Sequence, residues 1–255
     1  MATTKRKSID FQLDVEKYLL KMGTSIDEAM EEYSEVAAES FDIAEYYRQS
    51  QRRRPNVNSP SSLDCPKKMF FGRLGAPREQ RIKAQGFLTM LIGYLLGIIF
   101  SQLAAAIYGG ESEVTVEIPE LGVYGHCDHF FMYAETGELI LLEFKTLGKS
   151  TFEKTPDYYR MQTATYAHGL NADKAYLVVF WMDGRRFKTI PVDIEKWWQE
   201  SKRRFELVEK HTHIGIPPAE GPSNPYFACA SCAFFRTCKP KIDLLPKGGR
   251  YGRKG

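Results

Sequence analysis

Hydrophobic and polar residues form their clearest pattern between residues 123 and 144. Two runs rich in β-branched and aromatic residues, 123–133 and 139–144, flank the polar, glycine-containing segment 134–138. This pattern predicts a β-hairpin. The second run begins Leu-Ile-Leu-Leu, which predicts that its strand is buried in a sheet.

Three charged residues of this hairpin, Asp128, Glu143 and Lys145, are predicted on one side of the sheet. Side chains alternate between the faces of a strand, so Glu143 and Lys145 point to one side and Phe144 to the other. The same alternation divides the first strand into two pairs: His126 with Asp128, and Cys127 with His129.

Paired carboxylates beside an ammonium group suit one kind of chemistry. Two carboxylates at one point can hold Mg²⁺ or Mn²⁺, which acidifies a bound water. The ammonium group can orient that water or stabilise a developing anion. A solvated strand face is the alternative interpretation of Glu-x-Lys, but unpaired charges in a buried strand would be costly.

The chain before the hairpin predicts helices and then a linker. Residues 9–50 show two apolar stripes typical of packing helices. The stripes are Leu13, Val15, Tyr18, Leu19 and Met22, then Ile26, Met30, Tyr33, Val36, Ala37 and Phe41. The Ser-, Pro- and Asn-rich stretch 55–62 predicts a linker. We therefore expect a helical arm over 1–55, a main domain over 56–240 and a basic, flexible tail over 241–255.

The uncharged segment 87–108 is long enough to span a membrane. Thr89, Ser101 and Gln102 interrupt it, together with two glycines, and its flanks show no aromatic belt. The pattern therefore favours a central helix buried under the sheet.

After the hairpin, periodicity predicts four more elements. They are a helix over 158–170, a buried strand over 175–181, a shorter strand over 185–191, and an amphipathic helix over 194–211 with Arg204 on its polar side. Gln162 and Tyr166 are four residues apart and share one face of the first helix. That spacing is equally typical of an ordinary half-exposed face.

Length and composition are those of an ordinary soluble protein. The 255 residues suffice for one large domain or two small ones, with 43% hydrophobic and 26% charged residues. A net charge of +3 indicates no particular partner. Residues 1–7 have no apolar stretch behind them, which argues against a cleavable signal peptide. We expect a cytoplasmic protein without a membrane partner.

Four of the five cysteines form a second pattern. Cys229, Cys232 and Cys238 lie close together, and Cys65 stands far upstream. In an intracellular chain this spacing favours metal ligation over disulfides. Four cysteines can hold Zn²⁺ or an iron–sulfur cluster, and the spacing does not choose between them.

Two other interpretations concern the remaining cysteine and two histidines. His211 or His213 could replace Cys65 as a fourth zinc ligand. Cys127, inside the predicted strand, is more typical of a buried apolar residue than of a ligand.

In their order and spacing, these motifs resemble those of RecB-like nucleases of the PD-(D/E)XK superfamily. The matching pieces are Gly125-x-x-Asp128, Glu143-x-Lys145 and Gln162-x-x-x-Tyr166. The upstream Cys65 and the downstream Cys229-x₂-Cys232-x₅-Cys238 resemble the iron–sulfur subgroup. That subgroup includes CRISPR-associated RecB-like exonucleases and the nuclease domain of AddB. The resemblance covers roughly residues 60–240.

The resemblance implies a restriction-endonuclease-like core and Mg²⁺- or Mn²⁺-dependent cleavage of DNA, usually single-stranded and from an end. Asp128 and Glu143 would be metal ligands, with the Phe144 carbonyl as a third, and Lys145 would act on the attacking water. Gln162 and Tyr166 would position Lys145 and the DNA strand.

It also implies a [4Fe-4S] cluster, generally structural, on the four cysteines Cys65, Cys229, Cys232 and Cys238. The partners it implies, besides DNA, are recombination or CRISPR adaptation proteins, and some relatives form rings.

One feature departs from the family pattern, which commonly includes a metal-binding histidine in a Gly-x-x-x-His context before the sheet. Gly93 to Gly97 stands at the corresponding place, and the alternative register leads from Gly86 to Met90. We expect that the chain either holds one metal where relatives hold two or recruits His126.

The sequence as a whole predicts an α/β nuclease with a mixed, mostly antiparallel central sheet flanked by helices, and a cysteine-ligated iron–sulfur lobe. The predicted reaction is hydrolysis of DNA phosphodiester bonds, as an exonuclease with endonuclease activity left open. Two alternatives remain: a catalytically weak or inactive accessory protein that binds DNA ends, and a zinc-stabilised interaction module.

Overall fold

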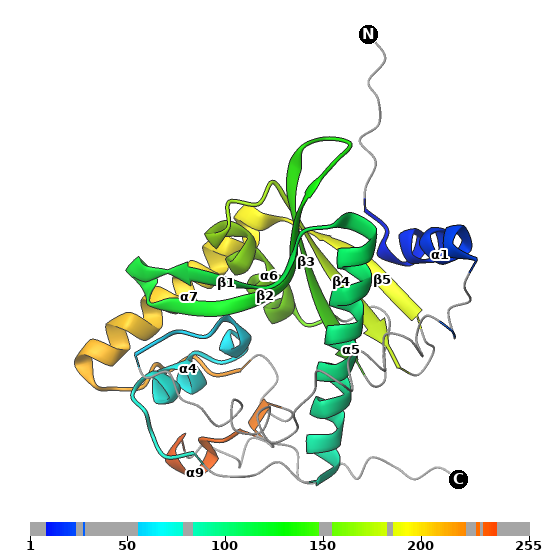
Figure 1. Cartoon of the computed structure of the whole chain (residues 1–255). Helices are drawn as coiled ribbons and strands as arrows, with labels where there is room; N and C mark the ends of the chain where they lie inside the picture. Colours follow the sequence, from blue (N-terminus) through cyan, green and yellow to red (C-terminus); the bar gives the residue numbers. More distant parts are fainter. Residues whose placement is uncertain are drawn as a thin grey trace.

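The computed structural model describes residues 9–23, 28, 56–78, 84–147, 155–182, 186–222, 228–229 and 232–238. At their centre lies a five-stranded sheet in the order β1-β2-β3-β4-β5 (Figure 1). The strands are β1 (Glu111–Ile118), β2 (Val123–Tyr133), β3 (Glu138–Leu147), β4 (Lys174–Trp181) and β5 (Arg186–Val192). Neighbouring strands are antiparallel except β3 and β4, which are parallel. The predicted mixed, mostly antiparallel sheet is confirmed.

Helices cover both faces of this sheet (Figure 1). Helices α1 (Phe11–Met22) and α5 (Ala84–Tyr108) pack on one face and α6 (Asp157–Gly169) on the other. Helix α7 (Ile194–Ile214) packs against α6, and α4 (Pro66–Arg73) packs against α7. The short helices η1 (Pro60–Ser62), η2 (Pro119–Leu121) and α9 (Phe235–Cys238) complete the described elements.

The predicted hairpin forms at the expected place. Strands β2 and β3 pair from His129↔Leu142 to Tyr133↔Glu138. Gly137 closes the turn with φ of 70°, a left-handed conformation that glycine adopts without steric cost, and its N–H donates to the Tyr133 carbonyl at 2.8 Å.

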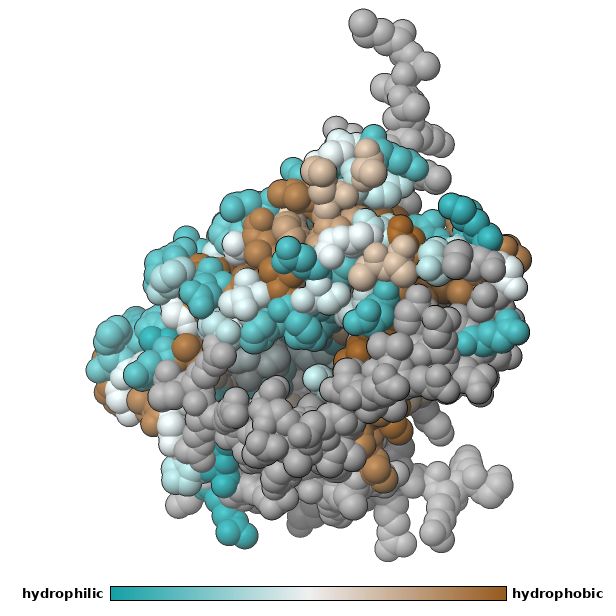
Figure 2. All heavy atoms as spheres, in the orientation of Figure 1, coloured by the Kyte–Doolittle hydropathy of each residue, from teal (hydrophilic) through white to brown (hydrophobic). Residues whose placement is uncertain are grey.

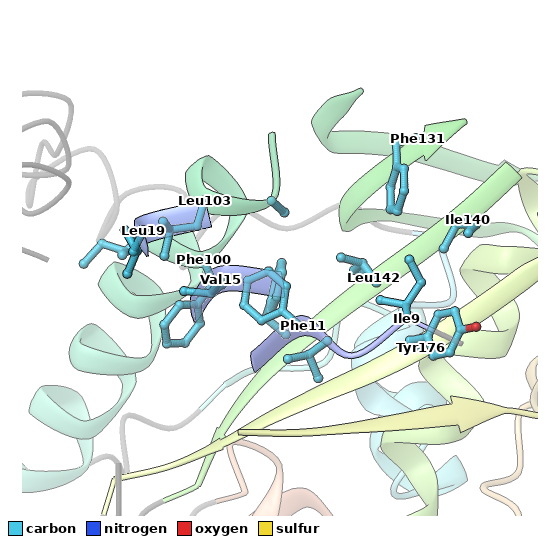
Figure 3. Close-up of a cluster of buried hydrophobic side chains, with 14 residues drawn as sticks. Ile9, Phe11, Val15, Leu19, Phe100, Leu103, Phe131, Ile140, Leu142 and Tyr176 are labelled. Atoms are coloured by element: carbon cyan, nitrogen blue, oxygen red, sulfur yellow. The ribbon is translucent and has the colours of Figure 1, made fainter. Parts of the chain in front are cut away.

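The core on the α5 side is largely aromatic. Phe11 of α1 packs against Phe144 of β3, with ring centroids 5.1 Å apart, and Phe100 of α5 lies 5.8 Å from the same ring. Figure 3 shows this cluster, with Val15, Leu19 and Leu103 beside Phe11 and Phe100. The first helix therefore belongs to the core of the sheet domain, although the boundary predicted at residue 55 stays a prediction.

Parts of the predicted apolar pattern are corrected. Phe11, absent from the predicted stripe, is fully buried, whereas Leu13 is 45% exposed because the buried stripe of α1 follows Phe11, Val15 and Leu19. The second stripe, 26–41, and the basic tail, 241–255, lie outside the described residues.

The expectation that 87–108 is buried under the sheet is only half right. Ile99, Phe100, Leu103 and Ala104 are buried against β2 and β3. The earlier turns are exposed in the described part of the chain, with Leu88 at 55%. Within that part, Leu88–Tyr108 is long and apolar enough to cross a membrane by length and composition, with 28% of it buried.

Two further corrections concern polar residues. Asn58, inside the predicted linker, is fully buried and donates to the carbonyl of Leu121 at 2.7 Å, so this stretch packs onto the domain. Arg204, predicted on the polar side of its helix, is 9% exposed because its guanidinium donates to the Leu63 carbonyl and pairs with Glu200.

The surface on the face seen in Figure 2 is mixed. Hydrophilic residues cover much of the described part, and hydrophobic residues lie among them in smaller groups.

Candidate active site where strands β2 and β3 separate

The acidic residues of the hairpin lie where two neighbouring strands stop pairing. Strands β2 and β3 pair as far as His129 and Leu142, and beyond this point β2 pairs only with β1 and β3 only with β4. Asp128 on β2 and Glu143 on β3 are the next residues after the last pair. The separation leaves backbone groups of β3 available on the side that faces β2.

Asp128 takes one of these backbone groups. The Phe144 N–H donates to Asp128 Oδ2 at 2.6 Å. The N–H and C=O of one strand residue point toward the same neighbouring strand, so the Phe144 carbonyl also faces the Asp128 side. Its aromatic ring lies on the opposite face, in the core with Phe11 and Phe100. The Phe144 carbonyl is the group that the family resemblance implies as a third metal ligand.

Glu143 and Lys145 lie on the same face of β3 and form an ion pair. The ammonium of Lys145 donates to Glu143 Oε1 at 2.6 Å. Glu143 is 1% exposed, and its second oxygen, Oε2, is buried without a hydrogen-bond partner. An unpaired buried carboxylate oxygen is unfavourable, and a cation would satisfy it.

The two carboxylates and the ammonium group act on one another electrostatically. Burial and, after it, the charge of Asp128 raise the pKa of Glu143 to about 8, although Lys145 opposes both effects. Burial also raises the pKa of Asp128, against Lys145 and the Phe144 N–H. Burial alone would lower the pKa of Lys145, but the charges of Glu143 and Asp128 raise it instead. The site therefore holds a cationic lysine beside carboxylates that ionise reluctantly without a further positive charge.

The predicted alternation along β2 is wrong at Asp128. Cys127 packs on the α6 side, with Ala164 and Tyr166, whereas His129 contacts the Gly109 carbonyl on the α5 side. Two residues separated by one position should share a face in a regular strand. The strand is irregular here because Asp128 has no partner in the pairing with β1, which passes from Ser112↔His129 to Val114↔Cys127.

Gln162 and Tyr166 of α6 support the site from behind. The Gln162 amide donates to the Tyr166 hydroxyl at 3.2 Å, and the two residues are 6% and 3% exposed. Burial raises the pKa of Tyr166, and the charge of Glu143 is the next contribution, which places the ring near that carboxylate. Their burial leaves little of either side chain for contact with a DNA strand.

Gly125 allows this close approach. A Cβ atom at this position would lie 2.7 Å from a ring carbon and 2.8 Å from the hydroxyl oxygen of Tyr166. Any side chain at 125 would therefore push Tyr166 away from Glu143. The glycine of Gly125-x-x-Asp128 and the tyrosine of Gln162-x-x-x-Tyr166 are thus parts of one contact.

Sequence reasoning missed Glu113, on the neighbouring strand β1. Desolvation raises the pKa of the Glu113 carboxyl to about 7, and the charge of Asp128 contributes to the rise, although the residue is exposed. Alternating residues from Glu111 to Ile118 could have predicted the strand. No sequence signal distinguishes Glu113 from Glu111 or Glu117 on it.

The structure describes two of the residues considered in connection with the family histidine, His126 and Gly97. His126 is exposed and contacts the Tyr124 hydroxyl at 3.3 Å. Gly97 is one helical turn before Ser101, whose hydroxyl donates to the Asp128 carbonyl at 3.3 Å. A Cβ at Gly97 would meet nothing within 4 Å, and glycine itself has no side chain that could bind a metal.

The four motif cysteines lie in one region without ligand geometry. Burial above all raises the pKa of Cys65 to about 12, and the charge of Cys232 contributes; burial and Cys232 also raise the pKa values of Cys229 and Cys238. Among the described residues, however, no group of three or more His, Cys, Asp or Glu side chains is close enough to hold a metal ion. Cys127 is fully buried in the α6-side core, as an apolar residue would be.

Comparison with known proteins relates the chain to solved structures by fold. The crystal structure of SSO0001 superposes with a TM-score of 0.53 at 16% sequence identity, over 82% of this chain and 95% of that one. An alkaline exonuclease, LHK-Exo from Laribacter hongkongensis, matches at a TM-score of 0.39 and 16% identity, over 63% of this chain and 92% of that one. Its complex with dAMP matches at 0.40 and 14%, over 62% and 91%. No family model and no curated protein matches the chain. The likeness to SSO0001 shows a shared fold.

Proposed function

We propose that this protein is a divalent-metal-dependent deoxyribonuclease with a restriction-endonuclease-like core, of the RecB-like PD-(D/E)XK type. The observation that carries this proposal is the buried, unpaired Oε2 of Glu143 beside Asp128 and Lys145. Hard carboxylate oxygens of this kind hold Mg²⁺ or Mn²⁺.

Asp128, Glu143 and the Phe144 carbonyl would hold the metal. The fit is supported by the reluctance of both carboxylates to ionise together and by the orientation of the Phe144 backbone. A divalent ion bound there would acidify a water molecule and offset the charge of the substrate phosphate.

The lysine and the α6 residues have separate roles in this proposal. Lys145, cationic and anchored by Glu143, donates hydrogen bonds that orient the attacking water or stabilise the developing negative charge. Tyr166 and Gln162 keep Glu143 in position from the core side.

Aromatic and cationic side chains beside the site favour a single-stranded substrate. The Lys145 ammonium lies 5.6 Å from the centroid of the Tyr159 ring. On the neighbouring helices α6 and α7, the guanidinium of Arg160 and the ammonium of Lys196 lie 6.0 and 5.0 Å from the centroid of the Trp197 ring. Bases of a single strand stack on such rings while the cations hold its phosphates. Cleavage from a DNA end, in recombination, repair or CRISPR adaptation in the cytoplasm, is the role we propose.

The experiment that tests this function is a cleavage assay on single-stranded DNA labelled at either end. With Mn²⁺ or Mg²⁺ we expect degradation, which a chelator abolishes, and the product ladder gives the polarity. Duplex and circular single-stranded DNA separate exonuclease from endonuclease action. Binding without cleavage by folded protein would instead support the DNA-end-binding alternative.

The affinity for the metal should rise with pH. The pKa of Glu143 is raised to about 8, so its carboxyl is largely protonated at pH 6 in the metal-free protein, and metal binding must expel this proton. We expect Mn²⁺ affinity to rise about tenfold per pH unit between about pH 6 and 8 and then to level off. Calorimetry at several pH values, in buffers of different ionisation enthalpy, measures both the affinity and the released protons. An affinity that is constant over this range would contradict the prediction.

For the cysteine region we propose a [4Fe-4S] cluster on Cys65, Cys229, Cys232 and Cys238. The support is that the Cys232 thiol acts electrostatically on each of the other three thiols. Ligation of a cluster would require the four side chains to come closer together than they are in this structure. Anaerobically purified protein should absorb near ~400 nm and contain iron and sulfide, and Cys232→Ser should lose both while Cys127→Ser keeps them. Colourless protein with one equivalent of zinc would contradict the cluster and favour a zinc site.

A further inference from the structure

His129 lies at the point where strand β2 loses its regular pairing on both sides. It forms the last pair of β2 with β3, opposite Leu142, and it also faces Ser112 of β1. The preceding residue, Asp128, has no partner in either pairing. A fully buried histidine therefore stands directly beside the residue whose carboxylate would hold the metal.

Both nitrogens of the His129 ring have a hydrogen-bond partner. Nε2 lies 2.8 Å from the Gly109 carbonyl oxygen, and Nδ1 lies 3.1 Å from the Ser112 hydroxyl oxygen. A carbonyl oxygen can only accept, so Nε2 donates to it, and in the neutral ring Nδ1 then accepts from the hydroxyl. The ring thus joins β2 to β1 and to the turn between α5 and β1.

The turn that receives the ring is closely packed against β2. Gly109 and Gly110 connect α5 to β1 with φ of 69° and 90°, conformations that favour glycine. A Cβ atom at Gly110 would lie 2.5 Å from the Cβ atom of Phe131, so no side chain fits between this turn and β2. The Gly109 carbonyl is therefore held at a fixed place, where it accepts from His129.

These bonds keep His129 on the α5 side of the sheet. Cys127 packs on the α6 side, and in a regular strand His129 would follow it there. The irregular step between them is Asp128, whose carbonyl also accepts from the Ser101 hydroxyl of α5 at 3.3 Å. Because such an irregularity persists only where its surroundings impose it, the bonds of His129 help to maintain the step.

The irregular step gives the Asp128 carboxylate its position. Regular pairing would continue from His129 and Leu142 to Asp128 and Glu143. Instead, the Phe144 N–H donates to Asp128 Oδ2 at 2.6 Å, so the carboxylate is tied to β3 beside Glu143. Whatever holds the step therefore also holds this carboxylate.

From this geometry we infer that His129 is a positioning residue of the candidate site. Through its bonds to Gly109 and Ser112, it holds the step of β2 that directs the Asp128 carboxylate to β3. Since both ring nitrogens are engaged, His129 acts through Asp128 and is not itself a metal ligand. The inference rests on the proposed metal site and adds to it a residue outside the family motifs.

The Phe144 amide reports the position of Asp128 without any metal. Hydrogen exchange of the metal-free, full-length protein, followed by NMR, measures how firmly this amide is held. We expect His129→Phe, which keeps a ring but has no nitrogen, to speed its exchange at least about tenfold and to raise the Kd for Mn²⁺, measured by calorimetry, by a similar factor. His129→Gln keeps an N–H donor for the Gly109 carbonyl and should stay within about threefold of the wild type.

Phe131→Leu is the matched control for a general loss of stability. Phe131 lies two residues further along β2, on the same face, in the regularly paired part of the strand, and is 2% exposed. Its variant should lower the resistance to urea but leave the Kd for Mn²⁺ within about twofold of the wild type. Exchange at Phe144 is compared between variants after correction for the stability of each to urea.

The outcomes separate this inference from the proposed function. If His129→Phe matches Phe131→Leu in both exchange and Kd, His129 has no positioning role. If the wild type binds no Mn²⁺ at millimolar concentration, the proposed metal site is overturned, and exchange at Phe144 alone decides whether His129 positions Asp128. If His129→Phe does not fold, Ser112→Ala, which removes one of the two bonds, decides instead: faster exchange at Phe144 supports the inference, and unchanged exchange contradicts it.

Discussion

Replacing Lys145 with methionine should slow DNA cleavage by about 10²- to 10⁴-fold. The ammonium is the group at the candidate site that can donate hydrogen bonds to a water or phosphate oxygen, and Glu143 holds it at 2.6 Å. Methionine has a similar length without the charge or the donors. Single-turnover cleavage of end-labelled single-stranded DNA with Mn²⁺ measures the effect.

A matched control exists on the same sheet. Lys174 of β4 pairs with Glu138 at the same distance of 2.6 Å, and its side chain is 26% exposed, compared with 20% for Lys145. Lys174→Met should therefore change cleavage by less than about threefold, although it removes an ion pair of similar geometry. Cleavage by Lys145→Met within threefold of the wild type would remove Lys145 from the reaction.

Folding of the Lys145 variant needs its own check because Glu143 is buried. Removing one partner of a buried ion pair is destabilising unless the remaining carboxyl takes up a proton. Lys145→Arg keeps the positive charge and hence the pair, but its planar guanidinium donates with different geometry. We expect this variant to remain as stable as the wild type to within about 1 kcal/mol and still to lose at least tenfold in rate.

Phe11→Ala should destabilise the protein by about 3–5 kcal/mol. Phe11 is fully buried, and its ring contacts Phe144 at 5.1 Å and Phe187 at 5.6 Å between centroids. Its backbone N–H donates to the Thr189 hydroxyl of β5 at 3.0 Å, which ties the start of α1 to the sheet. Truncation would leave a cavity between α1, β3 and β5. Urea unfolding followed by circular dichroism measures the change.

The control for this prediction lies in the same helix. Leu20 is 80% exposed, so Leu20→Ala should change stability by less than about 0.5 kcal/mol. Equal stability of Phe11→Ala and Leu20→Ala would mean that α1 does not unfold with the sheet domain, as expected of a separate arm. Because Phe11 supports Phe144, whose N–H binds Asp128, the Phe11 variant should also lose Mn²⁺ affinity near its unfolding midpoint.

Local patterns identified the hairpin and most of the sheet. Alternation, turn residues and apolar runs are properties of neighbouring residues, so they could be found without knowing the fold. They placed β2, β3 and β4 and grouped Glu143 with Lys145 on one face of a buried strand. The same patterns could have shown β1, whose residues alternate from Glu111 to Ile118.

Local patterns failed where distant parts of the chain meet. Nothing near Arg204 shows that its guanidinium reaches the Leu63 carbonyl, and nothing near Asn58 shows that it is buried against Leu121. The exposure of the first turns of α5 likewise depends on how far the sheet extends beneath the helix. Such contacts join residues far apart in sequence, and their burial is decided by packing.

The sequence by itself determined the types of residue at the candidate site, because Asp128, Glu143 and Lys145 have chemistry that their neighbours in the chain do not share. Only the tertiary structure decided how these groups face one another. The separation of β2 from β3 turns the Phe144 backbone toward Asp128, and the pairing of β1 with β2 leaves an irregular step at Asp128. Strand register and bulges arise from the pairing of whole strands, and that pairing is a property of the assembled sheet.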